Sequence, residues 1–97
     1  MATITIQVTQ DDIDKGERKQ RCRCPVWRAI NRAAPYLDRL QVIYLYATCR
    51  APAGDSRVIQ LPEVASNFIH CFDGGLPGSP LAFDLDVPDD LIPAVTP

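Results

Sequence analysis

Nine prolines divide this chain of 97 residues into short segments and restrict where helices can run. Proline is tolerated in the first turn of a helix but ends a helix when it occurs further along. Pro25 and Pro62 therefore mark the starts of two helices, and Pro35 ends the first of them near Ala34. The other prolines fall in turns or in the C-terminal stretch, at positions 52, 77, 80, 88, 93 and 97.

Two segments near the ends of the chain alternate apolar and polar residues, which is the pattern of a half-buried β-strand. Residues 3–8 alternate isoleucine and valine with threonine and glutamine. Residues 81–86 alternate in the same way and place Asp84 and Asp86 on the polar face. We expect each segment to bury one face and expose the other.

Three short helices are expected between these strands. Thr9 stands three residues before Asp12, close to a capping box, which predicts a helix over 10–15 that Gly16 ends. The helices that begin at the two prolines carry apolar residues at helical spacing. These are Val26, Ala29, Ile30 and Ala33 in the second helix, and Val64, Ala65, Phe68, Ile69 and Phe72 in the third.

The middle of the chain predicts a hairpin. Residues 40–48 are rich in β-forming residues with apolar groups on both faces, so we expect one central strand, and residues 57–61 return after a turn. The fold class is therefore α+β, with a small, mostly antiparallel sheet of three or four strands packed against two or three helices in the order β-α-α-β-β-α-β. Residues 1–86 form this single domain, and the proline-rich, acidic residues 87–97 form a poorly ordered tail.

The cellular location is expected to be the cytoplasm. No run approaches the roughly 20 apolar residues that span a bilayer, and the N-terminus lacks the features of a secretion signal. Thiols stay reduced in that compartment, so we expect no disulfide. The four cysteines are Cys22, Cys24, Cys49 and Cys71.

The sequence contains no strong catalytic or metal-binding constellation. The Cys22-x-Cys24 spacing is not that of a zinc site or of a redox dithiol. His70 and Cys71 are neighbours and point about 100° apart on a helix, so they cannot form a nucleophile pair there. We expect no enzyme activity, no cofactor and no metal. Cys24 would lie beside a helix start, Cys49 and Cys71 would be small buried apolar residues, and His70 would lie at the core edge or in solvent.

The charged residues are distributed unevenly, although the net charge is only −2. Residues 15–32 contain seven basic residues and one acidic residue, a local balance of +6. No lysine or arginine follows Arg57, whereas six acidic residues do, a balance of −6. This asymmetry predicts two surfaces of opposite charge.

Each of the two surfaces suggests a different binding partner. The acidic one would contact a positively charged groove of another protein and imitate nucleic acid, through Asp84, Asp86, Asp89, Asp90, Glu63 and Asp73. The basic one lies in an exposed, flexible loop and the following helix, and would contact phosphates through Arg18, Lys19, Arg21, Arg23, Arg28 and Arg32. In both cases a merely solvated surface is the alternative.

Several segments together resemble a group of small, mostly uncharacterised phage and prophage proteins. The similarity covers roughly residues 3–86 through short motifs: Thr9-Gln10-Asp11-Asp12-Ile13-Asp14-Lys15-Gly16, Cys24-Pro25-Val26, Ala29-Ile30, Arg32-Ala33, Leu61-Pro62-Glu63-Val64, Phe68-Ile69, Phe72-Asp73 and Phe83-Asp84-Leu85. The resemblance implies an accessory protein that acts inside an infected bacterium. Inhibitors of host defence, including anti-CRISPR proteins, recur among small acidic phage proteins.

The leading hypothesis is therefore a non-enzymatic, monomeric inhibitor similar to anti-CRISPR proteins, located in the cytoplasm of the bacterial host. Its partner would be a host defence protein or nucleoprotein complex, bound through the acidic surface, with no membrane involved. The alternative hypothesis is a phage accessory protein that binds nucleic acid through residues 15–32.

Overall fold

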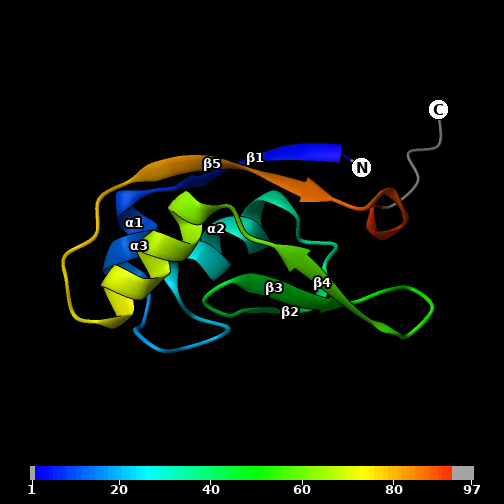
Figure 1. Ribbon diagram of the computed structural model, residues 1–97, viewed down its shortest axis with the longest axis horizontal. Coiled ribbons are helices and arrows are strands. Elements are labelled where there is room, and N and C mark those ends of the chain that lie inside the picture. Colours follow the sequence, from blue (N-terminus) through cyan, green and yellow to red (C-terminus); the bar gives the residue numbers. More distant parts are fainter. Residues whose placement is uncertain (1, 93–97) are drawn as a thin grey trace.

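The computed structural model describes residues 2–92, which form five strands, three α-helices and one 3-10 helix (Figure 1). Met1 and residues 93–97 lie outside the described residues. In chain order the elements are β1 (Ala2–Val8), α1 (Gln10–Lys15), α2 (Pro25–Ala33), β2 (Asp38–Val42), β3 (Tyr46–Arg50), β4 (Ser56–Gln60), α3 (Glu63–Asp73), β5 (Leu81–Val87) and η1 (Asp89–Leu91).

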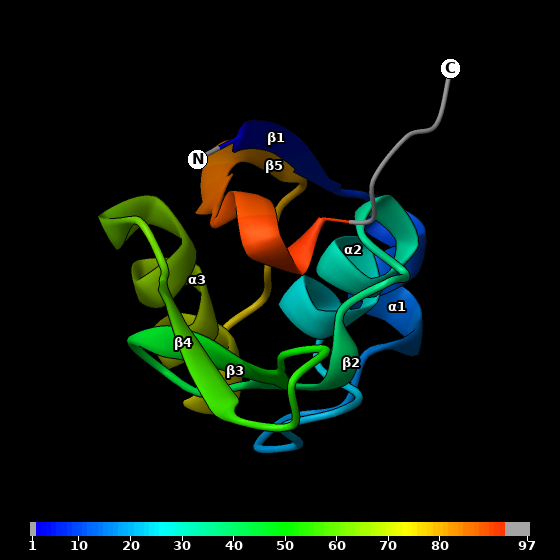
Figure 2. The same cartoon turned by 90° about the vertical axis from the view of Figure 1, so that its right-hand side faces the viewer.

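The strands form two separate antiparallel units. Strands β1 and β5 pair as a two-stranded ribbon, with Ala2 opposite Val87 and Val8 opposite Leu81. Strands β2, β3 and β4 form a three-stranded sheet in that order. Figure 2 shows the ribbon above and the sheet below, with α2 along one side, α3 along the other and the orange-red turn η1 between them.

The α+β class and the order of helices and strands are confirmed, and the run at 40–48 proves to be a hairpin instead of one strand. Strand β2 ends at Val42, and Ile43 and Tyr46 exchange backbone hydrogen bonds of 2.8 and 3.2 Å around Tyr44 and Leu45. No glycine or proline marks this turn. It is held from outside, because the Leu45 carbonyl accepts a hydrogen bond from the backbone N–H of Leu61.

The core lies between the ribbon and the sheet. The alternation of both ribbon strands is confirmed, since Ile6, Val8, Leu85 and Val87 are fully or almost fully buried. The helical stripes are confirmed with two exceptions. Ala33 is exposed at the end of α2, and Val64 is exposed on the outer side of α3, whereas Ala65, Ile69 and Phe72 of the same helix are buried.

The predicted capping box at the start of α1 is confirmed. The Thr9 hydroxyl accepts a hydrogen bond from the Asp12 backbone N–H at 3.2 Å, and the Asp12 carboxylate accepts one from the Thr9 N–H at 3.0 Å. Gly16 follows the last helical residue, and the position requires glycine for a steric reason. A Cβ atom there would lie 2.6 Å from the Pro25 ring, so only glycine lets α1 approach α2 this closely.

The Asp12 carboxylate is fully buried and forms an ion pair with Arg32. Arg32 donates to both carboxylate oxygens at 2.8 and 2.7 Å, and to the Gln7 carbonyl of β1 at 2.9 Å. Arg28 lies nearby, with Nε 3.6 Å from Asp12 Oδ1. Burial raises the pKa of Asp12, but the hydrogen bonds and charge of Arg32, with the bonds of Thr9, outweigh it and lower this pKa to about 2.

The C-terminal stretch departs from the expectation of a tail that begins at residue 87. Val87 is buried at the end of β5, and Leu91 is 5% exposed because η1 turns it into the core. Arg57 of β4 forms an ion pair with Asp90. Residues 87–92 therefore belong to the folded domain, and the rest of the expected tail, 93–97, lies outside the described residues.

Asp12→Asn tests the importance of the buried ion pair. The substitution should lower the free energy of unfolding at pH 7 by about 2 kcal/mol, the value that corresponds to the lowered pKa. Because the folded-state pKa is depressed, this stability is present above pH ~4 and disappears as the pH falls toward 2. Urea unfolding between pH 2 and 7 measures it.

Asp14→Asn is the matched control, since Asp14 lies exposed on the same helix and accepts a hydrogen bond from Gln10. It should change stability far less. Equal effects of the two substitutions would contradict a special role of Asp12.

Candidate interaction surfaces

The outer face of the ribbon carries two aspartates side by side with two threonines. Asp86 lies opposite Thr3 and accepts a hydrogen bond from its hydroxyl at 2.8 Å, and Asp84 lies opposite Thr5 and accepts one at 3.1 Å. All four side chains are exposed. We call this set, Thr3, Thr5, Asp84 and Asp86, the acidic ribbon face. The threonines orient the carboxylates without neutralising them.

The other acidic residues expected on the same surface are placed elsewhere. Asp90 is in the ion pair with Arg57, whose hydrogen bond lowers the pKa of Asp90 and raises that of Arg57. Asp73 ends α3 and accepts a hydrogen bond from the Lys19 backbone N–H at 2.9 Å. Glu63 is exposed in the first turn of α3, where it suits the helix dipole, and Asp89 is exposed on η1.

A groove runs beside the acidic ribbon face, between β5 and β4. Its volume is about 380 Å³. Asp84, Asp86 and Pro88 line one wall, and the other wall is formed by Val58, Ile59, Gln60, Leu61 and Pro62. These residues include two carboxylates and no basic side chain, so the groove is suited to a cationic ligand.

Of the six basic residues expected on the alternative surface, four form an ion pair or an aromatic contact within the described part of the chain and two do not. Arg32 and Arg28 contact Asp12 inside the fold, and Arg28 lies 3.7 Å from Asp11 as well. Arg18 lies over the Phe72 ring, with its guanidinium carbon 4.7 Å from the ring centre. Arg23 pairs with Glu17 at 3.3 Å on the surface. Within residues 2–92, Lys19 and Arg21 are the two of the six that form no ion pair or aromatic contact.

The basic loop at 17–23 is exposed, as expected, but its backbone is anchored to the fold at several points. The Arg21 carbonyl accepts a hydrogen bond from Val42 of β2 at 2.8 Å, and the Arg18 side chain donates to the Phe72 carbonyl of α3 at 2.9 Å. Lys19 adopts a positive φ of 60°. These contacts oppose the flexibility that the composition suggested. The loop borders a shallow hollow of about 550 Å³ that Gln20 and Gln41 help to line.

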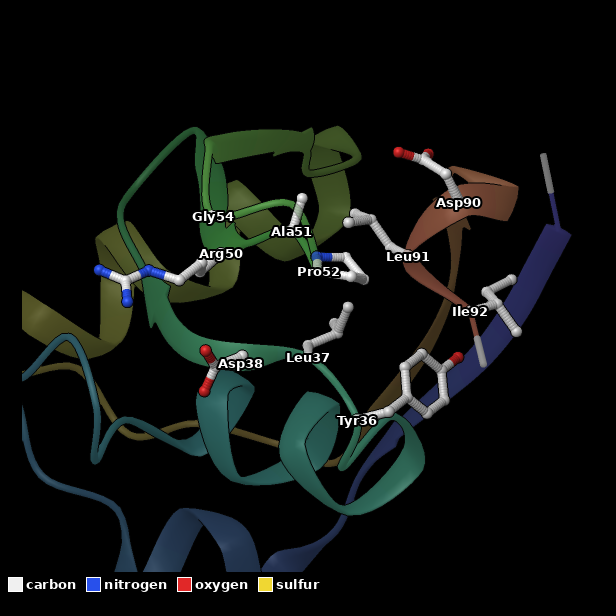
Figure 3. Close-up of a pocket in the computed structure, with 10 residues that line it drawn as sticks. All are labelled: Tyr36, Leu37, Asp38, Arg50, Ala51, Pro52, Gly54, Asp90, Leu91 and Ile92. Atoms are coloured by element: carbon white, nitrogen blue, oxygen red, sulfur yellow. The ribbon is translucent and has the colours of Figure 1, made fainter. Parts of the chain in front are cut away.

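A mainly apolar pocket of about 450 Å³ lies at the end of the three-stranded sheet away from the basic loop (Figure 3). Leu37, Pro52 and Leu91 point toward its centre, while Asp38 and Arg50 lie to one side. It contains no histidine, cysteine or hydroxyl nucleophile besides Tyr36. Its last lining residue, Ile92, is also the last described residue of the chain.

The cysteines and the histidine do not come together as a site. Cys24 is buried and caps α2, since its sulfur accepts a hydrogen bond from the Trp27 N–H at 3.3 Å, and Cys49 is buried as expected. Cys71 is exposed, so its expected burial is wrong: it lies on the solvent side of α3. Exposed His70 stacks on Tyr44, with ring centres 5.3 Å apart. Among residues 2–92 no cluster of three metal-binding side chains occurs.

Thr3, Thr5 and Arg57 contribute to the surfaces but were not predicted as site residues. The alternation of residues 3–8 placed the threonines on an exposed face. Only the pairing of β1 with β5, which are far apart in the chain, shows that they meet Asp86 and Asp84.

Comparisons with protein families, with characterised proteins and with solved structures found no significant match for this chain. Over the described residues, no helix combines the length and the apolar character needed to cross a bilayer.

Thiol labelling of the folded protein tests the placement of the cysteines. Burial raises the pKa of Cys24 to about 11, so this thiol is both shielded and protonated at pH 8. A disulfide reagent should modify Cys22 and Cys71 quickly, and Cys24 and Cys49 only after denaturation. Cys71→Ser should reduce the fast phase by half. Equal rates for all four thiols would contradict this arrangement.

Proposed function

We propose that the protein is a non-enzymatic, monomeric binding protein whose acidic ribbon face contacts a positively charged surface of another protein. The observation that carries this proposal is the pair Asp84 and Asp86, held side by side by threonine hydroxyls. Within residues 2–92 neither aspartate has a basic partner. Uncompensated carboxylates attract a cationic surface, speed association and fix its orientation.

The specific form of the proposal is a phage-encoded inhibitor, similar to anti-CRISPR proteins, that acts in the cytoplasm of a bacterial host. Its partner would be a defence protein or nucleoprotein complex with a groove built for phosphates. The support is the resemblance of the sequence to small phage proteins and the ability of spaced carboxylates to occupy phosphate sites.

A plaque assay tests the biological part of this proposal. The protein is expressed in bacteria whose CRISPR systems, one type per strain, target the infecting phage. Plaque formation should recover in at least one strain and should be lost again with Asp84→Asn/Asp86→Asn. Recovery in none of the strains contradicts an anti-CRISPR role.

A binding assay tests the surface itself. The tagged protein is used to capture partners from nuclease-treated lysate of a sensitive strain, and the affinity of the captured partner is then measured. Asp84→Asn/Asp86→Asn should weaken this affinity about tenfold, or ~1.4 kcal/mol. The control Asp14→Asn/Asp55→Asn removes the same charge from exposed positions outside the ribbon. Equal losses from both pairs of substitutions would exclude the acidic ribbon face.

One observation favours nucleic-acid binding as a second candidate function. Lys19 and Arg21 have no ionic partner within residues 2–92 and lie on an anchored loop beside a hollow. This function predicts that short DNA or RNA shifts at 50 mM salt, and that Lys19→Ala/Arg21→Ala removes the shift while Arg50→Ala, an exposed arginine on β3, retains it. No shift at low salt would eliminate this candidate.

A further inference from the structure

The groove between β4 and β5 has open strand edges on both walls. In an antiparallel pair, residues alternate between those that exchange backbone hydrogen bonds with the neighbouring strand and those whose backbone groups point away. Two hydrogen bonds, one at each end of β4, show which of its residues bond to β3. Ala51 donates to the Asp55 carbonyl at 2.8 Å, and Leu61 donates to the Leu45 carbonyl at 3.1 Å.

Alternation between these two bonds shows, for each residue of β4, whether its backbone groups point toward β3 or toward the free edge. Arg57 and Ile59 exchange bonds with β3, so the backbone N–H and C=O groups of Val58 and Gln60 point to the free edge. Within residues 2–92 these groups have no hydrogen-bond partner. The Val58 side chain is also 63% exposed.

The opposite edge of the same sheet is covered, in contrast to β4. On β2 the Val42 N–H donates to the Arg21 carbonyl, and the Leu40 carbonyl accepts a hydrogen bond from the Trp27 indole at 2.8 Å. Folded proteins usually protect sheet edges by such cover, by lysine or by proline. Within residues 2–92, strand β4 has none of these protections between Ser56 and Gln60, and its one arginine, Arg57, is in an ion pair with Asp90.

On the ribbon wall of the groove, backbone groups of β5 likewise point toward a free strand edge. The Gln7 carbonyl of β1 accepts its hydrogen bond from Arg32 on α2, so Gln7 faces away from β5. By alternation Ile4 and Ile6 bond to β5, and the backbone groups of Asp84 and Asp86 point away from β1. These two residues are also the ones of β5 that line the groove.

The charge and spacing of the walls indicate what the groove would hold. Asp84 and Asp86 are two residues apart on one strand, which places them about 7 Å apart. Alternate side chains of an extended peptide have the same spacing, so two lysines or arginines could each face one carboxylate. Val58, Pro62 and Pro88 supply apolar surface for a residue between them.

We propose that the groove binds an extended, lysine- or arginine-containing segment of a partner protein, which adds to the sheet as a fourth strand along β4. Backbone hydrogen bonds to Val58 and Gln60 supply affinity, and the two aspartates select basic side chains. This inference rests on the proposed function, because it describes how the acidic ribbon face recognises its partner.

A labelled peptide of alternating lysine and valine, about six residues long like a typical strand, is the probe. Fluorescence anisotropy at low salt should show binding, and N-methylation of alternate amides in the peptide should weaken it at least tenfold. Hydrogen exchange gives a second measurement. The Val58 and Gln60 amides should exchange quickly in the free protein and at least tenfold more slowly with saturating peptide, while Ile59 should be slow in both states.

Val58→Pro and Val58→Thr form the matched pair of variants. Among the backbone hydrogen-bonding groups, proline removes the outward N–H at this edge position, whereas threonine keeps it. Val58→Pro should abolish peptide binding with the thermal transition retained, and Val58→Thr should bind as the parent protein does. The N-methylated peptide tests the same bond if the proline variant fails to fold.

The other outcomes overturn the inference in different ways. Equal binding of methylated and unmethylated peptides, lost with Asp84→Asn/Asp86→Asn, would overturn strand addition but leave the acidic ribbon face as the binding surface. Absence of binding, or binding insensitive to both aspartates, would overturn the inference, and the partner measurement above then decides separately about the proposed function. A dimer of the free protein that protects Val58 would show that a second copy occupies the edge.

Discussion

The ion pair between Asp12 and Arg32 joins three parts of the fold at one buried carboxylate. Asp12 completes the cap of α1, Arg32 lies on α2, and the same guanidinium binds the Gln7 carbonyl of β1. A buried carboxylate is costly unless it is paired and hydrogen-bonded, so the ribbon and the two helices must keep this arrangement. The ribbon is thereby fixed against α2, and its acidic outer face is fixed with it.

Internal pairing also decides which charges remain for a partner. The basic segment has a large local charge in the sequence, but Arg28 and Arg32 both contact the buried carboxylate of Asp12. On the surface, Asp90 forms an ion pair with Arg57. A charge count along the chain therefore overestimates the charge that each of the two surfaces can offer to a partner. Within residues 2–92, Asp84 and Asp86 lie two residues apart on the ribbon face and have no basic partner.

The two edges of the three-stranded sheet differ in whether other segments cover them, and this difference connects the fold to the proposed recognition. The basic loop covers β2 with the Arg21 carbonyl, and Trp27 covers it further along. Over residues 2–92, the edge of strand β4 has no such cover, and it lies beside a groove lined by Asp84 and Asp86. An open strand edge can form backbone hydrogen bonds with an added strand of any sequence. The neighbouring carboxylates, which lack a basic partner, add a preference for basic side chains.

The sequence by itself determined the features that depend on neighbours in the chain. The alternation at 3–8 and 81–86, the capping box of Thr9, the helix start at Pro25 and the α+β order could all be predicted, because their causes lie within a few residues. Tertiary structure decided the rest. The turn at Tyr44 and Leu45, the fold of residues 87–92, and the meeting of Thr3 and Thr5 with the aspartates depend on contacts between distant segments, which no local pattern encodes.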